Sequence, residues 1–106
     1  MADYFEFTVN VKDTDKNNIE GAKVSIQDIT EETTSEGYTD ENGNILFYVL
    51  ANNHISIENV TYDLYEIKSG LVSIPKITEN LTAKIVLKKI IIKYNLSFTS
   101  TTMEKA

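Results

Sequence analysis

Residues 5–12 read Phe-Glu-Phe-Thr-Val-Asn-Val-Lys, with an apolar side chain at every second position. Successive side chains of a β-strand point to opposite faces of a sheet, so this strict alternation indicates a strand with one buried face. The odd-numbered side chains, from Phe5 to Val11, are expected to point into a core. The even-numbered side chains are expected to face water.

Further short segments repeat this pattern along the chain. Apolar residues alternate in 22–26 and 54–58, residues 45–50 are a further strand-forming apolar segment, and stretches rich in Asp and Asn separate them. In one of these stretches, Asn42-Gly43 predicts a tight hairpin turn with Gly43 at a positive φ. Such short strands and frequent turns indicate an all-β sandwich or barrel. We expect its core to contain Phe5, Phe7, Val9, Val11, Val24, Ile26, Ile45, Phe47, Ile55, Ile57, Ile85 and Leu87.

Two segments have a weaker pattern. Residues 30–37 contain no apolar side chain, and we interpret them as a loop or a solvated sheet edge. Residues 62–68 fit either a strand or a short irregular segment, which Ser69-Gly70 ends.

The last third of the chain changes its phase. The apolar residues are odd-numbered from Leu81 to Leu87 and even-numbered after Lys88-Lys89. One strand cannot bury both sets on one face without a bulge, so we predict two strands. Residues 1–89 would form the sandwich, and residues 90–106 would add a C-terminal strand and a polar tail. The apolar face of that strand, which we expect to bind an assembly partner or a second copy, consists of Ile90, Ile92, Tyr94, Leu96 and Phe98. The alternative is an eighth strand of the same sandwich.

Composition limits the classes of function. The chain has 106 residues, 42% of them hydrophobic, which fits one globular domain. All ten basic residues are lysine and the net charge is −6, which argues against nucleic acid as a partner. The apolar runs are too short for membrane insertion. The N-terminal residues do not resemble a secretory signal, so we expect synthesis in the cytoplasm.

The sequence gives little indication of a catalytic or metal-binding site. His54 is the single histidine and there is no cysteine, so neither a catalytic triad nor a thiolate site can form. The stretches 13–17 and 40–44 resemble the start of a calcium loop, but both lack its later glycine and glutamate, and turns explain them. We therefore expect no enzyme activity, no cofactor and no metal.

Four tyrosines are candidates for stacking on sugars. An aromatic ring combines an apolar face with a polar tip, and Tyr4, Tyr48, Tyr62 and Tyr65 are expected to point outward. The alternative is that they are ordinary strand-forming residues.

Three stretches together resemble a known family. They are the strand 5–11, the segment Ile19-Glu20-Gly21-Ala22 with its strand to Ile26, and Tyr38-Thr39-Asp40-Glu41-Asn42-Gly43 with the strand after it. Their order resembles the carboxypeptidase-regulatory-like and collagen-adhesin B-type domains, over roughly residues 5–89. The resemblance implies a seven-stranded, Ig-like and transthyretin-like Greek-key sandwich, here with the extra C-terminal strand. Some such domains carry a lysine–asparagine isopeptide bond, but Val11 rather than Lys12 is expected to face inward.

The resemblance implies a non-catalytic structural or interaction module, because such domains act as stalks, spacers, adhesion modules or parts of phage particles. The leading hypothesis is a phage or virion accessory protein, such as a decoration, fibre or tail-associated protein located in the virion. The alternatives are an adhesin repeat on a cell surface, a carbohydrate-binding module, and an accessory domain of an enzyme complex.

Overall fold

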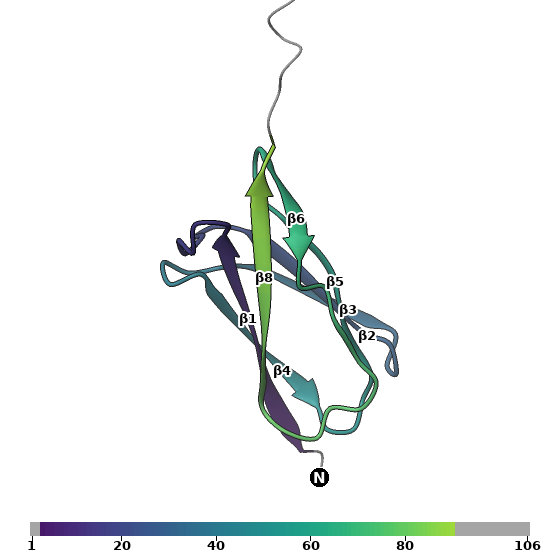
Figure 1. The fold of residues 1–106 in the computed structure, drawn as a ribbon. Coiled ribbons are helices and arrows are strands. Elements are labelled where there is room, and N and C mark those ends of the chain that lie inside the picture. The colour runs from purple at the N-terminus through teal and green to yellow at the C-terminus, as the bar shows by residue number, and fades with distance from the viewer. Residues whose placement is uncertain (1–2, 91–106) are drawn as a thin grey trace, which may run out of the picture.

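The computed structural model describes residues 3–90, which form two four-stranded β-sheets packed face to face (Figure 1). In spatial order, the first sheet contains β4 (Asn44–Leu50), β1 (Tyr4–Asp13), β8 (Leu81–Lys89) and β6 (Tyr65–Ser69). The second sheet contains β3 (Thr33–Tyr38), β2 (Lys23–Asp28), β5 (Ile55–Thr61) and β7 (Ser73–Ile74). Residues 3–90 contain no helix, so none that could span a membrane. The predicted all-β sandwich is confirmed.

The first and last described strands are parallel neighbours. β1 pairs with β8 over seven residue pairs, from Phe7 opposite Leu81 to Asp13 opposite Leu87. Figure 1 shows both strands running side by side along the length of the sandwich, so that the chain enters at one end and β8 finishes at the other. Sequence alternation assigns the buried face of each strand, but it does not identify the neighbouring strand.

The core lies between the two sheets and follows the predicted alternation. Phe7, Val9 and Val11 of β1 are fully buried. Phe5 and Ile45, also expected in the core, are only partly buried. Phe5 lies near the open start of β1 and Ile45 lies on an edge strand, so fewer residues cover them. The core also includes residues that the predicted set does not contain: Ile19, Ala22, Val49, Val60, Ile77 and Ala83.

A β-bulge changes the buried phase of β5. Ile55 and Ile57 are buried, but the next buried residue is Val60, an even-numbered position. The pairing with β2 shifts there, because Ile26 lies opposite Ile57 while Ser25 lies opposite Asn59. Glu58 is thus the additional residue, and it lets one strand bury both sets of side chains.

The Asn42-Gly43 turn connects two sheets and not two strands of one sheet. Gly43 has φ 79°, as the sequence predicts. However, β3 belongs to the second sheet and β4 to the first, so the expected hairpin is wrong. The turn packs instead on the first strand, where the Val11 amide donates to the Gly43 carbonyl at 2.7 Å. A turn signature gives the local backbone shape, while the pairing depends on partners distant in sequence.

The two weakly patterned segments are both edge strands. The polar segment 30–37 overlaps β3, which confirms the solvated edge, and 62–68 overlaps β6. After Lys89, the Ile90 amide still donates to the Leu64 carbonyl at 2.8 Å. The rest of the predicted C-terminal strand, with Ile92, Tyr94, Leu96 and Phe98, lies outside the described residues.

Candidate functional site

The groups that sequence analysis considered for chemistry have structural partners. The His54 Nε2 atom lies 2.6 Å from the Ser73 Oγ atom, and His54 remains the single imidazole of the chain. In the described part of the chain, no cluster of three or more His, Cys, Asp or Glu residues could hold a metal ion.

The two calcium-like stretches are turns that share one hydrogen-bond pattern. The Asp13 carboxylate accepts from the backbone amides of Asp15 and Asn17, at 2.8 and 2.9 Å. The Asp40 carboxylate accepts from the amides of Asn42 and Asn44, both at 2.9 Å. The bond from the Asn17 amide is the main reason why the pKa of Asp13 is lowered. Aspartates in both places are thus explained as residues that close a turn.

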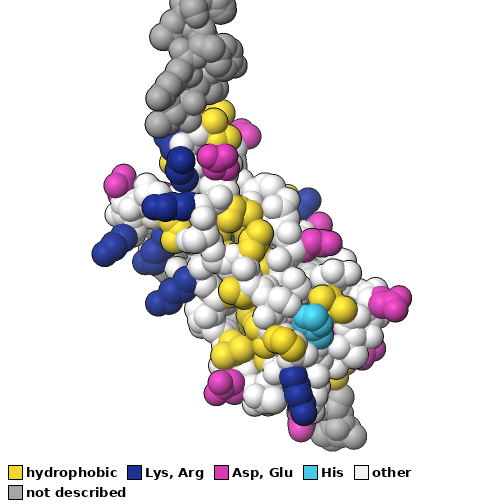
Figure 2. All heavy atoms as spheres, turned by 45° about the vertical axis from the view of Figure 1, so that its right-hand side comes forward, with side chains coloured by type: hydrophobic (Ala, Val, Ile, Leu, Met, Phe, Trp, Pro, Cys, Tyr) yellow, Lys and Arg dark blue, Asp and Glu magenta, His cyan; other side chains and the backbone are white. Residues whose placement is uncertain are grey.

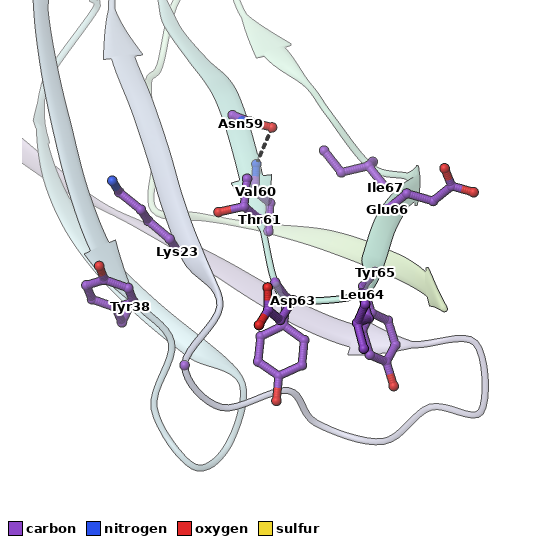
Figure 3. Close-up of a pocket in the computed structure, with 12 residues that line it drawn as sticks. Lys23, Tyr38, Asn59, Val60, Thr61, Asp63, Leu64, Tyr65, Glu66 and Ile67 are labelled. Carbon is purple, nitrogen blue, oxygen red and sulfur yellow. Dashed lines mark hydrogen bonds between the residues drawn. The ribbon is translucent and has the colours of Figure 1, made fainter. Parts of the chain in front are cut away.

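One end of the sandwich carries a wide hollow, which we call the tyrosine hollow (Figure 3). Its volume is about 650 Å³. Lys23 and Tyr38 flank it on one side, and Tyr65, Glu66 and Ile67 of β6 flank it on the other. The full lining is Gly21, Lys23, Tyr38, Asn59, Val60, Thr61, Tyr62, Asp63, Leu64, Tyr65, Glu66 and Ile67.

The hollow combines aromatic and charged groups. Tyr62 and Tyr65 form a tilted aromatic pair with ring centroids 5.4 Å apart. Tyr38 is the most exposed of the three tyrosines, at 65%. The Lys23 ammonium lies 3.5 Å from the Glu36 carboxylate in a solvent-exposed ion pair. Such a surface can offer aromatic rings and polar groups to a ligand, but it holds no buried group with the geometry of a catalyst.

The four tyrosines selected from the sequence lie in two places. Tyr62 and Tyr65 line the tyrosine hollow, whereas Tyr4 and Tyr48 line a second cavity of about 290 Å³. Tyr38 also lines the hollow, and sequence analysis did not select it because it follows a polar stretch with no alternation. A signal was nevertheless present, since an aromatic residue just before a turn is often exposed at the end of a strand.

We call this second cavity the edge groove, because it opens between the two edge strands β3 and β4. Its lining is Tyr4, Ile26, Asp28, Glu31, Thr33, Ser35, Tyr48, Val49 and Leu50. Tyr4 and Tyr48 are 59% and 67% exposed, although they are large aromatic residues.

A further apolar surface lies on the side of the sandwich opposite the edge groove. The segment between β6 and β7 exposes Leu71 and Val72, at 48% and 39%. Figure 2 shows hydrophobic side chains in a band on this face, with His54 beside it and charged groups around it. Of the predicted partner-binding residues, Ile90 is exposed at 42%, and the other four lie outside the described residues.

Solved structures with the same fold are pilin and pilus-adhesin domains. The streptococcal ancillary pilin matches with a TM-score of 0.65 and 16% identity over 81% of this chain. A C-terminal fragment of the pilus adhesin SpaC from Lactobacillus rhamnosus GG matches with 0.66 and 13% over 86%. The C-terminal domain of the shaft pilin SpaA from the same organism matches with 0.57 and 13% over 82%. At these identities the similarity establishes the fold.

The chain spans 32% of the streptococcal pilin, 47% of the SpaC fragment and 98% of the SpaA domain. No protein family matches the sequence, and no curated protein matches it significantly. The fold defines the class of protein as an Ig-like β-sandwich of the kind found in pilins.

Proposed function

We propose that this chain is a non-catalytic structural module of a cell-surface assembly. The observation that carries the proposal is the parallel pairing of β1 with β8, which puts the start of β1 and the end of β8 at opposite ends of the sandwich (Figure 1). Modules with this geometry can be joined end to end in one line. With β8 nine residues long, each copy would extend such a line by about 30 Å.

Three features support this function. The folds of pilin and pilus-adhesin domains are similar to this one. Within residues 3–90, His54 lies within hydrogen-bond distance of Ser73, and Asp13 and Asp40 act within turns, so these groups considered for chemistry have structural roles. The exposed apolar side chains, among them Tyr4, Tyr48 and Leu71, offer surfaces for protein partners.

Surface labelling of the source cells tests the proposal. Antibodies raised against the folded domain should label intact cells as strongly as permeabilised cells, and they should label isolated surface filaments. An antibody against a cytosolic protein, which should label only permeabilised cells, is the control. Labelling of this chain only after permeabilisation would overturn the proposal, and labelling of phage particles would restore the virion hypothesis.

Carbohydrate binding is a second candidate, and the tyrosine hollow is the observation that favours it. Three tyrosines and three charged side chains, Lys23, Asp63 and Glu66, surround a cavity of about 650 Å³. A glycan array followed by titration of any hit tests this function. Tyr38→Ala and Tyr62→Ala should each weaken binding, while Tyr48→Ala, which removes a ring outside the hollow, should not. An array without signal, or equal loss in all three variants, would remove this candidate.

A further inference from the structure

The edge strand β4 has the properties of a strand that accepts another strand. Among residues 3–90, β1 is the one strand that pairs with β4, and only the ends of β4 bond to other residues, Asn44 to Asp40 and Leu50 to Asn53. Its sequence, Asn-Ile-Leu-Phe-Tyr-Val-Leu, has no charged residue and no proline, the usual means of protecting an edge. The side chains of Leu46 and Tyr48, on the face of β4 that points away from the core, are 43% and 67% exposed. By contrast, β3 carries the Glu36 that pairs with Lys23, and β7 has two residues.

The edge groove gives an added strand room for its side chains. Ile26 of β2 and Val49 of β4, both core residues, are part of its lining. Ser35 pairs with Ile26 of the neighbouring strand β2, and Thr33 pairs with Asp28 of that strand. Paired residues point to the same face of a sheet, so Ser35 and Thr33 both lie on the inward face of the second sheet. These small side chains leave the inward face of β3 open where a sandwich would normally place large apolar ones. An added strand could fill this space.

We propose that the edge groove binds residues 90–98 of a second copy of this chain as an additional strand antiparallel to β4. That segment carries Ile90, Ile92, Tyr94, Leu96 and Phe98 at alternate positions, so a strand would present one apolar face. Main-chain hydrogen bonds to β4 would supply affinity, and the side chains over Thr33 and Ser35 would supply specificity.

The distance along the sheet favours a second copy over the same chain. Tyr48 lies opposite Glu6, and the Glu6 amide donates to the Asn80 side chain at 2.8 Å, so Tyr48 is level with residue 80. From residue 80 to Lys89, β8 rises by roughly 30 Å. Residues 90–98 span at most about 32 Å when fully extended. A strand beyond β4 also lies three strand spacings, about 14 Å, to the side of β8, so at most Phe98 could approach this level and the apolar side chains as a set cannot line the edge groove of their own chain.

End-to-end copies meet this requirement. The edge groove lies toward the end of the sandwich where β1 begins, because its β4 residues pair with the start of β1. In a line of modules, β8 of the preceding copy finishes at that end (Figure 1). The segment after it would then run against the direction of β4, which gives the antiparallel pairing. The inference thus rests on the proposed function in one respect, the end-to-end arrangement.

Assembly of the full chain tests the inference by analytical ultracentrifugation over a range of concentrations. The wild-type chain should form linear oligomers. Ser35→Arg puts a long charged side chain into the edge groove and should raise the concentration for half-assembly at least about tenfold. Thr34→Arg is the matched control, because the neighbouring position on β3 faces the other side and is also exposed. It should assemble like the wild type, and circular dichroism should show that both variants fold.

A mixing experiment distinguishes strand exchange from other contacts. Leu96→Asp should disable the donated segment and leave the groove intact, so this variant alone should be monomeric. Mixed with Ser35→Arg, whose segment is intact, it should form dimers that grow no further. A monomeric wild-type chain, a Ser35→Arg chain that assembles normally, or a mixture without dimers would overturn the inference. Surface labelling of cells is independent of this result, so the proposed function could survive its failure.

Discussion

Gly70 lies where the chain leaves the first sheet after β6 and crosses to the second. Its φ is 111°, and a Cβ atom there would meet the Lys84 carbonyl oxygen and come within 2.9 Å of the Ile85 Cα atom. Backbone atoms of a central strand cannot move aside without disturbing the pairing of β8. Gly21 also has a positive φ, 84°, but a Cβ atom there would contact nothing within 4 Å.

This pair of glycines separates backbone strain from steric contact. Gly21→Ala should lower the free energy of unfolding by about 1 kcal/mol, the cost of a left-handed alanine. Gly70→Ala carries the same cost and the contact with β8, so we expect a loss larger by at least about 2 kcal/mol. Urea denaturation of both variants measures the difference. Equal losses would mean that the crossing at Gly70 is looser than the described geometry.

Asp13 links stability to pH. Its pKa is lowered in the folded chain, chiefly by the backbone amide of Asn17, so the folded state favours the charged carboxylate. This contribution is fully present above the pKa of the unfolded chain. It decreases as the pH falls below that value and is lost below the folded pKa.

Asp13→Asn should therefore reduce the loss of stability on acidification, because an asparagine oxygen can accept the same amide bonds without titrating. Asp15→Asn removes an equal charge from the same turn, but Asp15 joins the turn through its backbone amide. This control should keep the acid dependence of the wild type. Urea midpoints from neutral pH down to the acid range give the comparison, and identical profiles for the two variants would contradict the assignment.

At the scale of elements, strict alternation predicted the faces of β1 and β8 well. Alternation alone does not locate a bulge. The core predicted from the sequence therefore lacks Val60, which is buried at an even-numbered position after the odd-numbered Ile55 and Ile57. Ile77 is fully buried in a loop, where its amide and carbonyl bond to Asn53 and Asn52. A single apolar residue between polar neighbours has no period, so sequence could not assign it to the core.

The candidate site was predictable only in part for a similar reason. Alternation places Tyr4 and Tyr48 outward, and both are exposed. The expectation that Tyr65 points outward is wrong, because its side chain packs against the core, and which tyrosines meet depends on sheet order. Tyr62 and Tyr65 form one aromatic pair, whereas Tyr48 lies beside the start of β1, opposite Glu6. The parallel contact between β1 and β8 joins residues more than seventy positions apart, and no local pattern specifies it.

The position of each strand in its sheet predicts how strongly its amides resist hydrogen exchange. β1 lies between β4 and β8 and carries the fully buried Phe7, Val9 and Val11, so its central amides should be the most protected. β7 is a two-residue edge strand and should exchange fastest among the strands. Exchange followed by NMR tests this order. Protection of β7 equal to that of β1 would contradict it.

At the scale of the whole molecule, the parallel pair decides how the domain carries load. A force applied between the ends of a line of modules pulls β1 and β8 in opposite directions along their length. The seven paired positions then resist together in shear. β1 also pairs antiparallel with β4, and the Ala51 amide donates to the Asp3 carbonyl at 2.9 Å. Pulling Asp3 and Ala51 apart would open that pair one bond at a time.

Single-molecule force spectroscopy can compare these two directions in one protein, because the chain has no cysteine and introduced ones give unique attachment points. Anchors at Asp3→Cys and Lys89→Cys load β1 against β8 in shear. Anchors at Asp3→Cys and Ala51→Cys peel β1 from β4. Since hydrogen bonds broken together resist more than bonds broken in sequence, shear should need at least about twice the rupture force of peeling. Similar forces in both directions would show that the β1–β8 pair is not the mechanical element of the domain, and would weaken the proposal that it is a structural module joined end to end.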